Sequence, residues 1–207
     1  MSAKTKIWLF AAVALFLLGA ILFFCVMMAL GWRFDKLSTT QYETNIHNID
    51  DAFTNIRIET DTASVRFLPA VDGAARVECY EEEKVTHTVC VTDGTLRVKA
   101  NDTRAWYEHI GIHLGTPKVT VYLPQKTYDT LHVSVSTGSI DIPQDFAFAW
   151  VNARTSTGSV ALRAHEAGEV TVKTTTGAIT VENVHCSSLS LSVSTGSVTV
   201  KNVSATG

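Results

Sequence analysis

Two histidines and a glutamate lie close enough in the sequence to suggest a metal site. His109 and His113 are four residues apart, with Glu108 beside them, and on a helix this spacing would direct both imidazoles to one side, as zinc ligands require. Gly111 and the isoleucines around it favour a strand instead, and the glutamate does not stand between the histidines as it does in zinc proteases. We therefore predict no metal ligands and no cofactor, and we interpret the histidines as solvent-facing.

Serine and threonine are abundant, but their arrangement does not predict nucleophilic catalysis. A nucleophile needs a base that a third group holds in place, and the repeated serines have no histidine at a matching offset. Outward positions around the repeats alternate in charge, whereas a polysaccharide-cleaving β-helix would cluster Asp with Lys or Arg to hold calcium and abstract a proton. We therefore predict no catalytic residues and a protein that is not an enzyme.

Three aromatic residues are the candidate binding residues. Trp106, Tyr107 and Trp150 could form a platform for sugars, because the face of an aromatic ring packs well on apolar C–H groups. The alternative is that these rings cover the core at the ends of strands.

One four-residue motif occurs four times, and it defines the strands that must position these residues. The copies are Ser136-Thr137-Gly138-Ser139, Ser156-Thr157-Gly158-Ser159, Thr175-Thr176-Gly177-Ala178 and Ser194-Thr195-Gly196-Ser197. The glycines are 20, 19 and 19 residues apart, which indicates a structural repeat. We expect each threonine to hydrogen-bond the turn backbone and each glycine to supply the positive φ that the corner requires.

Apolar residues alternate with polar ones on both sides of each glycine. The apolar positions before the glycines are Leu131, Val151, Val170 and Leu189, then Val133, Ala153, Val172 and Leu191; those after them are Ile140, Val160, Ile179 and Val198, then Ile142, Leu162, Val181 and Val200. This period of two predicts two short strands per repeat, bent at Thr-Gly. We predict an all-β, right-handed β-solenoid with about 19–20 residues per repeat. The alternative is an antiparallel meander that closes into a sandwich, because Thr-Gly can also form a two-residue hairpin turn.

The part of the chain before the regular repeats is expected to contain degenerate copies. Residues around Ala63 match the repeat offsets, and those around Gly94 resemble another copy. Strands at 76–80 and 84–91 flank an acidic turn and predict a hairpin, while 101–116 reads as an irregular insertion.

Four cysteines do not make a disulfide framework. Cys79 and Cys90 could meet across the predicted hairpin, but they would not stand directly opposite each other. The alternative is that both are small buried hydrophobes.

The N-terminal segment predicts a membrane anchor. Residues 7–30 carry no charge, and a helix of this length would measure about 36 Å, enough to cross a bilayer with tilt. The apolar run is longer than that of a cleaved signal peptide, and no small-residue cleavage site follows it. We predict a cytoplasmic tail at 1–6, a signal anchor at 7–30, a polar tether at 31–51 and a β-repeat ectodomain at 52–207. The last residues open a further turn without a capping end, so we expect a truncated chain or stacking on a partner.

The charge of the chain excludes one class of partner. From residue 37 onward there are 13 Lys and Arg against 19 Asp and Glu, a net charge of −6. A surface of that sign gains nothing from counterion release on nucleic acid and is repelled by anionic lipid. We therefore predict no nucleic acid partner.

Several short motifs carry a resemblance to a known family. They are Phe53-x-x-Ile56-x-Ile58, Ala63-Ser64-Val65 with Pro69, Tyr122-Leu123-Pro124 with Tyr128-x-x-Leu131, and the Ser-Thr-Gly-Ser repeats. Over about residues 50–207 the chain resembles the bacterial putative-adhesin family of β-strand repeat proteins (DUF4097-like). The resemblance implies a surface or membrane-attached protein of Gram-positive-type bacteria, and some members are linked to envelope stress and to antimicrobial peptides. It implies no catalytic residues. Many members place an acid after the turn glycine, where this chain has Ser139, Ser159, Ala178 and Ser197.

Together these observations predict a single-pass protein of the bacterial cell membrane whose C-terminal domain is extracytoplasmic. We expect a non-enzymatic, adhesin-like module that binds an envelope glycan or protein. One alternative is an envelope-stress component that acts through a protein partner, and another is an enzyme acting on glycans.

Overall fold

The computed structural model describes residues 3–33, 41–106 and 115–205. The chain divides into an N-terminal unit, which contains helix α1 (Ala3–Ala29), and a β domain that begins at Gln41. Helix α1 is uncharged beyond Lys6, and an 18-residue window within Thr5–Ala29 has a mean hydropathy of 2.9. Its 27 residues correspond to about 40 Å at 1.5 Å per residue, which exceeds the hydrocarbon thickness of about 30 Å. The predicted apolar helix is confirmed, and it is long enough to span a membrane.

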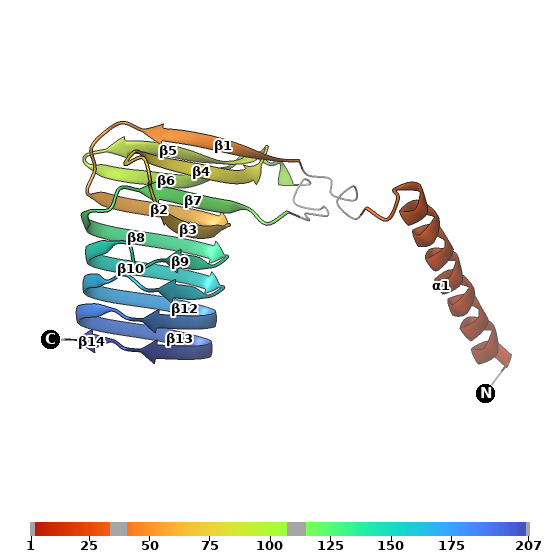
Figure 1. Cartoon of the computed structure of the whole chain (residues 1–207). Helices are drawn as coiled ribbons and strands as arrows, with labels where there is room; N and C mark the ends of the chain where they lie inside the picture. Colours follow the sequence, from red (N-terminus) through yellow and green to blue (C-terminus); the bar gives the residue numbers. More distant parts are fainter. Residues whose placement is uncertain (1–2, 34–40, 107–114, 206–207) are drawn as a thin grey trace. The chain divides into compact units, whose positions relative to one another are not determined.

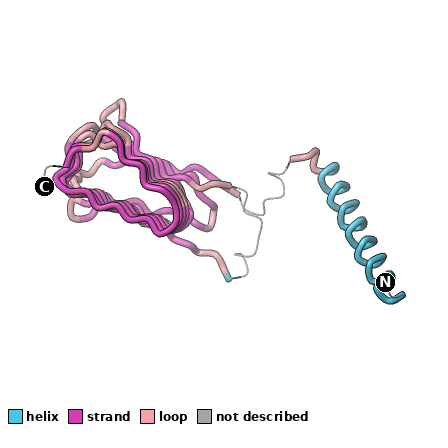
Figure 2. The backbone as a smooth tube through the Cα atoms, turned by 90° about the horizontal axis from the view of Figure 1, so that it is seen from below, coloured by secondary structure: helices cyan, strands magenta, loops and turns pink. Residues whose placement is uncertain are grey.

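The β domain is a stack of strands wound around one apolar interior (Figure 1). The strands are β1 (Tyr42–Ile49), β2 (Asn55–Thr62), β3 (Ser64–Pro69), β4 (Ala75–Glu82), β5 (Val85–Thr92), β6 (Thr95–Asp102), β7 (Lys118–Leu123), β8 (Thr127–Thr137), β9 (Ile140–Ile142), β10 (Ala147–Thr157), β11 (Val160–Leu162), β12 (Glu166–Glu182), β13 (His185–Lys201) and β14 (Ser204–Ala205). Viewed along the stack, its successive rungs overlay as one flattened loop (Figure 2).

The flattened loop has two faces. The first face contains β5, β6, β2, β8 and β10, in that spatial order, followed by the first halves of β12 and β13. The second face contains β1, β4, β7, β3, β9 and β11, followed by the second halves of β12 and β13. Each rung therefore contributes one strand to each face, and the apolar interior lies between them.

Within the repeats the strands pair in parallel, and equivalent repeat positions are direct neighbours. Val151 pairs with Leu131 on one side and with Val170 on the other, and Gly177 pairs with Gly196. The apolar columns predicted from the sequence face the interior, where Val151, Val170 and Val172 are fully buried. The same columns become partly exposed in β13, where Val198 and Val200 are 46% and 48% exposed.

The predicted degenerate copy around Ala63 is confirmed. In β2, Ile56 pairs with Leu131 of the first regular repeat, and in β3, Val65 pairs with Ile140. The Ala63 amide donates to the carbonyl oxygen of Thr137 at 3.1 Å. The first irregular rung thus stacks on the regular ones through the same backbone contacts.

The prediction of another repeat copy at Gly94 was wrong. Thr92 and Thr95 flank an antiparallel turn between β5 and β6, and Leu96 pairs with Ile56, whereas the repeat would place it beside Val65. Asp93 and Gly94 have φ of 51° and 67°, which is typical of the type I′ hairpin turn that Asp-Gly favours. The apolar pattern around a hairpin turn and around a repeat corner is the same, so spacing alone did not separate them.

Two further expectations for this end of the domain need correction. The second half of the predicted tether is strand β1, which pairs antiparallel with β4; its polar sequence hid it, because only one of its sides meets the interior. The predicted hairpin between β4 and β5 is limited to the pair Glu82 and Val85. Beyond that pair the two strands separate, since β4 joins the second face and β5 joins the first.

The stacking of the glycine corners leads to a first prediction. Gly158 has φ of 146°, and a Cβ atom there would lie 2.0 Å from the carbonyl oxygen of Gly138 in the neighbouring rung. We expect Gly158→Ala to lower the free energy of unfolding by about 1–3 kcal/mol through backbone strain alone. The total loss should exceed this range, because the two rungs must also separate to make room for the Cβ atom. Gly94→Ala, where φ is also positive but no atom lies within 4 Å, should cost about 1–2 kcal/mol. Equal denaturation midpoints of the two variants would contradict the close approach of the rungs.

The inward orientation of the apolar columns leads to a second prediction. Val172 is fully buried and the adjacent Lys173 is exposed. We expect Val172→Asp to destabilise the domain by about 3–5 kcal/mol, because a carboxylate would be buried without a partner, and Lys173→Ser to change stability by less than about 0.5 kcal/mol. Thermal unfolding followed by circular dichroism measures both, and similar melting temperatures would refute the assignment of the two sides of β12.

Candidate functional site

A polar groove lies on the outer side of the second face, and we call it the arginine groove. It encloses about 490 Å³. Its lining residues come from four adjacent parallel strands, β7, β3, β9 and β11, and from the turns beside them. They are Ser64, Val65, Arg66, Lys118, Thr120, Ser139, Ile140, Asp141, Ser159, Ala161 and Arg163.

The parallel register brings together residues that are far apart in the sequence. Thr120 pairs with Arg66, Arg66 pairs with Asp141, and Asp141 pairs with Ala161. Alternate residues of a strand point to opposite sides, so this row faces outward while the neighbouring Val65 and Ile140 are buried in the interior. The apolar columns therefore fix the polar row in place, strand by strand.

The charges of the arginine groove are unequal. Asp141 forms ion pairs with Arg66, Nε to Oδ2 at 3.3 Å, and with Arg163. Lys118 also lines the groove, so the lining contains three cationic side chains and one carboxylate. The side chain of Arg66 is 62% exposed and that of Arg163 is 41% exposed. Both guanidinium groups are thus oriented by Asp141 and remain accessible to a ligand.

Hydroxyl groups line the arginine groove beside the cations. Ser64, Ser139 and Ser159 occupy the position after each turn, and the Ser139 hydroxyl donates to the Ser64 oxygen at 3.1 Å. Guanidinium groups bind phosphate and carboxylate through paired N–H donors, and hydroxyls can both donate to and accept from a sugar or polyol. The groove can therefore hold an anionic group that is attached to a hydroxyl-rich chain.

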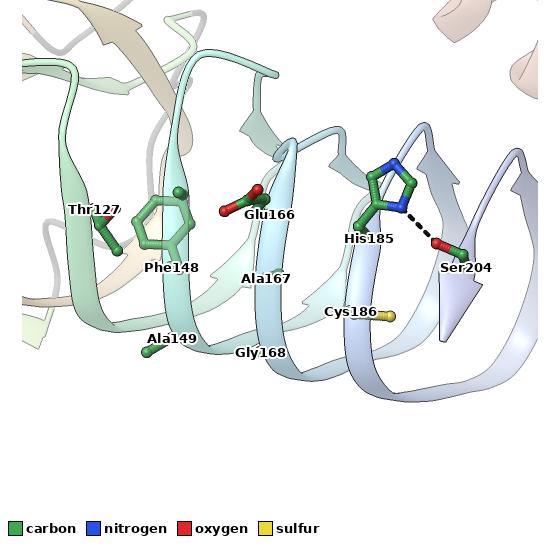
Figure 3. Close-up of a pocket in the computed structure, with 10 residues that line it drawn as sticks. Thr127, Phe148, Ala149, Glu166, Ala167, Gly168, His185, Cys186 and Ser204 are labelled. Carbon is green, nitrogen blue, oxygen red and sulfur yellow. Dashed lines mark hydrogen bonds between the residues drawn. The ribbon is translucent and has the colours of Figure 1, made fainter. Parts of the chain in front are cut away.

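A second depression, which we call the corner groove, follows the first residues of successive rungs on the first face (Figure 3). It encloses about 340 Å³. Small residues dominate its lining, which comprises Thr127, Ala147, Phe148, Ala149, Glu166, Ala167, Gly168, His185, Cys186 and Ser204.

The corner groove contains a serine, a histidine and a glutamate in one ladder column. His185 pairs with Ser204 on one side and with Glu166 on the other. The Nδ1 atom of His185 lies 2.5 Å from the hydroxyl oxygen of Ser204, but among the described residues no hydrogen bond joins His185 to Glu166. A nucleophilic triad needs both contacts. The arrangement therefore lacks the acid that would orient the base.

The structure places two of the predicted aromatic residues, Trp150 and Trp106, apart. Trp150 lies on the first face, at the same level along the strands as Thr95 at the start of β6, because the paired residues of β10, β8, β2 and β6 connect the two positions. Trp106 follows Asp102 at the end of β6 and is 78% exposed. Thr95 and Asp102 are seven steps apart along β6, about 23 Å at 3.3 Å per step. Tyr107, like His109 and His113, lies outside the described residues.

Trp150 has a partner of a different kind. Its ring stacks on the imidazole of His132 with centroids 6.5 Å apart and an interplanar angle of 6°. Burial lowers the pKa of His132, and the charge of the neighbouring Arg57 adds to this effect. A neutral imidazole therefore stacks on Trp150 near pH 7, and the pair forms a flat aromatic surface on the outside of the first face.

The role expected for the repeat threonines belongs to other threonines. Thr137, Thr157, Thr176 and Thr195 are exposed at the corners beside Gly138, Gly158, Gly177 and Gly196. The turn backbone instead accepts hydrogen bonds from two buried threonines, one in β10 and one in β12, each two residues before the corner threonine. Thr155 donates to the carbonyl oxygen of Gly138 and Thr174 to that of Gly158, both at 3.1 Å. These two hydroxyls connect β10 and β12 to the corner of the rung before each of them.

The arginine groove was not predicted from the sequence, although a signal was present. Alignment on the turns places Arg66 at the same offset after Ala63 as Asp141 after Gly138. Opposite charges at one repeat position in neighbouring rungs indicate an ion pair on the outer side. Lys118 carried no such signal, because β7 belongs to no recognisable repeat.

Comparison with known proteins gives similar solved structures and one family match. A solved structure described as a putative cell adhesion protein from Clostridium sporogenes is similar to this chain, with a TM-score of 0.55 and 9% identity over 79% of this chain and 99% of that one. Another, described as a putative adhesin from Bacteroides fragilis, gives a TM-score of 0.33 and 14% identity over 78% of this chain and 96% of that one. None of the curated proteins matches. The family model described as Toastrack DUF4097 matches residues 53–207.

The threonine contacts between rungs lead to a third prediction. Thr174→Val removes the donor to Gly158 without changing the shape of the side chain, and Val193 fills the same column in the next rung. We expect it to lower the free energy of unfolding by about 0.5–1.5 kcal/mol. Thr176→Val, at the exposed corner two residues later, is the matched control and should be neutral. A larger effect of Thr176→Val in chemical denaturation would restore the role first expected for the corner threonines.

Proposed function

The chain belongs to the Toastrack DUF4097 family, and from this premise we propose that it is a membrane-anchored, non-enzymatic binding module of the bacterial cell envelope. Residues 7–30 are the membrane span, 1–6 the cytoplasmic tail, and the β domain lies on the extracytoplasmic side as a right-handed solenoid with about 19–20 residues per rung. The length and hydropathy of α1 support the anchor. The Trp8 and Trp32 rings near the ends of the span support it too, because indoles favour the membrane interface.

The proposed ligand is an anionic, hydroxyl-rich polymer of the envelope, such as a chain of polyol phosphates or acidic sugars. The observation that carries this proposal is the excess of cations in the arginine groove. Arg66 and Arg163 share a single carboxylate, Asp141, and Lys118 adds a third cation beside the serine hydroxyls. A ligand phosphate or carboxylate would balance this excess through charge-assisted hydrogen bonds.

The net charge of −6 on residues 37–207 does not oppose such a ligand. Charges in water are screened over about 8 Å at physiological ionic strength. A ligand group seated in the arginine groove therefore responds to the three cations that touch it more than to acids elsewhere. The overall acidity instead disfavours adsorption of the domain to anionic surfaces away from the groove.

The repeat also gives the site a direction. Ser64, Ser139 and Ser159 follow the turns of three neighbouring rungs, and adjacent strands are about 4.8 Å apart. A polymer chain can lie along the stack and exchange hydroxyl contacts with one rung after another. Affinity would then come from several weak contacts positioned by the arginines, which suits recognition of a repeating ligand.

Binding by charge-reduced variants tests the proposal and is our fourth prediction. The full chain in lipid nanodiscs would be titrated with polyol phosphate polymer and, separately, with a neutral glycan of similar length. We expect Arg66→Gln with Arg163→Gln to weaken binding of the anionic polymer about 10-fold or more, since hydrogen bonds to charged groups contribute roughly 1.5–3 kcal/mol each. Binding of the unaltered chain should also weaken as salt is added.

The matched control is Arg57→Gln. Arg57 is an exposed arginine that pairs with Glu59 on the first face, so it resembles Arg66 in exposure and partner but lies outside the groove. Its replacement should leave the affinity unchanged. Equal loss in both variants would show binding by general charge. A salt-independent preference for the neutral glycan would assign the binding to another surface, of which the Trp150 and His132 pair is the first to test.

A further inference from the structure

The irregular end of the β domain buries a group of polar side chains that the proposed function does not use. Cys79 and Glu81 lie on β4, and His87 lies on β5. All three are buried, and the thiol sulfur, a carboxylate oxygen and an imidazole nitrogen lie within 4.8 Å of one another. These three atom types are the protein ligands of zinc.

Hydrogen bonds orient the side chains of this cluster. The His87 Nδ1 atom lies 2.6 Å from Oε2 of Glu81, and the Nε2 atom of the same ring lies 2.8 Å from the hydroxyl oxygen of Thr60. The Asn45 side-chain amide donates to Oε1 of Glu81 at 2.9 Å. The carboxylate thus presents Oε2 to the histidine, and the imidazole is fixed from both sides.

A fourth candidate ligand lies on the neighbouring strand β1, outside the group of three atoms. Among the described residues, Nε2 of His47 is the only buried side-chain nitrogen or oxygen without a hydrogen-bond partner. Asn45 stands opposite Cys79 in the ladder between β1 and β4, and its side chain reaches diagonally to Glu81. His47 stands opposite Val77, so its equivalent diagonal neighbour is Cys79. Diagonal neighbours on one side of a sheet are close enough for long side chains to meet.

We propose that Cys79, Glu81, His87 and His47 form a binding site for a divalent transition-metal ion, with Zn²⁺ as the best match. A thiolate, a carboxylate and two neutral imidazoles balance the two positive charges of the ion, so the buried complex is neutral. The set is one of sulfur, nitrogen and oxygen donors, which suits Zn²⁺ and Co²⁺ better than the oxygen-preferring Mg²⁺ or Ca²⁺.

The geometry requires a small contraction. Zn–S and Zn–N bonds of about 2.3 and 2.0 Å place tetrahedral ligands about 3.5 Å apart. The Cys79, Glu81 and His87 atoms, now within 4.8 Å of one another, would move inward by about 1 Å, and the His47 imidazole, which lies outside that group, would turn toward Cys79 to complete the set. Binding displaces the proton of the Cys79 thiol to solvent. The neutral His87 imidazole changes tautomer, so that its one proton moves by exchange with solvent from Nδ1 to Nε2. Nδ1 is then free to bind the ion, and Nε2 donates to the Thr60 hydroxyl oxygen, the second contact that ligating histidines usually make. Asn45 continues to hold the carboxylate.

The site would act as a structural staple. It links β1, β4 and β5, which meet through antiparallel pairs at the end of the stack where the repeat is absent. Because metal binds the folded chain and not the dispersed ligands, binding free energy becomes folding free energy.

Metal titration of the full chain is our fifth prediction. The chain, purified in detergent with a chelator and then freed of it, would be titrated with Co²⁺ and Zn²⁺. We expect one ion per chain and a thiolate-to-cobalt charge-transfer band. At Zn²⁺ concentrations near 100 times the dissociation constant, the melting temperature should rise by about 5–10 °C.

Four variants locate the ion. Cys79→Ser should abolish the charge-transfer band, whereas Cys90→Ser, at an exposed cysteine on β5, should retain it. His47→Gln removes no hydrogen bond at Nε2, so the metal-free variant should fold and melt normally while its affinity falls about 10–100-fold or more. The double variant His109→Gln with His113→Gln should bind as the unaltered chain does.

Distinct outcomes would overturn the site. Absence of stoichiometric Co²⁺ binding, or a charge-transfer band that survives Cys79→Ser, would remove the proposal altogether. Unchanged affinity in His47→Gln would exclude the four-ligand set. Loss of binding in the His109 and His113 variant would place the ion elsewhere. None of these results bears on the arginine groove, which lies on the outer side of the domain.

Discussion

The close stacking of one backbone corner on the next is the constraint on which the structure of the β domain depends. A Cβ atom at Gly158 or Gly177 would lie 2.0 Å from the carbonyl oxygen of the glycine one rung earlier, so only glycine allows the strands to pair in register on both faces. Register then decides everything that follows. It places the apolar columns inside, and it places the serines after the corners and the charged row of Arg66 and Asp141 outside.

The same constraint explains how a surface with binding chemistry arises from a sequence without a motif for it. Arg66 and Lys118 are outward residues of β3 and β7, and Arg163 directly follows β11. Parallel pairing converts their separation of tens of residues into neighbouring strands. Because Asp141 pairs with both arginines, their positions are fixed before any ligand arrives, which lowers the entropy that binding must overcome.

The repeats could be predicted from the sequence because each one shows the same alternation of apolar and polar residues around its corner. The irregular end could not. The residues around Gly94 follow the repeat pattern of apolar residues, but Asp93 turns the chain into a hairpin, and β1 is too polar to show the alternation of a strand. The candidate sites were hidden for a related reason. Trp106 and Trp150 are conspicuous as residue types yet lie apart, whereas the groove residues are ordinary types that only the register assembles.

The stacking constraint explains why buried polar side chains are hydrogen-bonded differently at the two ends of the interior. In the regular rungs, buried hydroxyls such as Thr174 bond the corner of the previous rung, so polar atoms are satisfied by the repeat itself. At the irregular end, Thr60 occupies the same column as Thr155, but its hydroxyl contacts His87. The polar cluster on β4 and β5 thus begins at the position where rung-to-rung bonding ends. A buried polar network that is fully bonded specifies one arrangement of strands, whereas one open nitrogen, that of His47, costs stability unless another atom binds it.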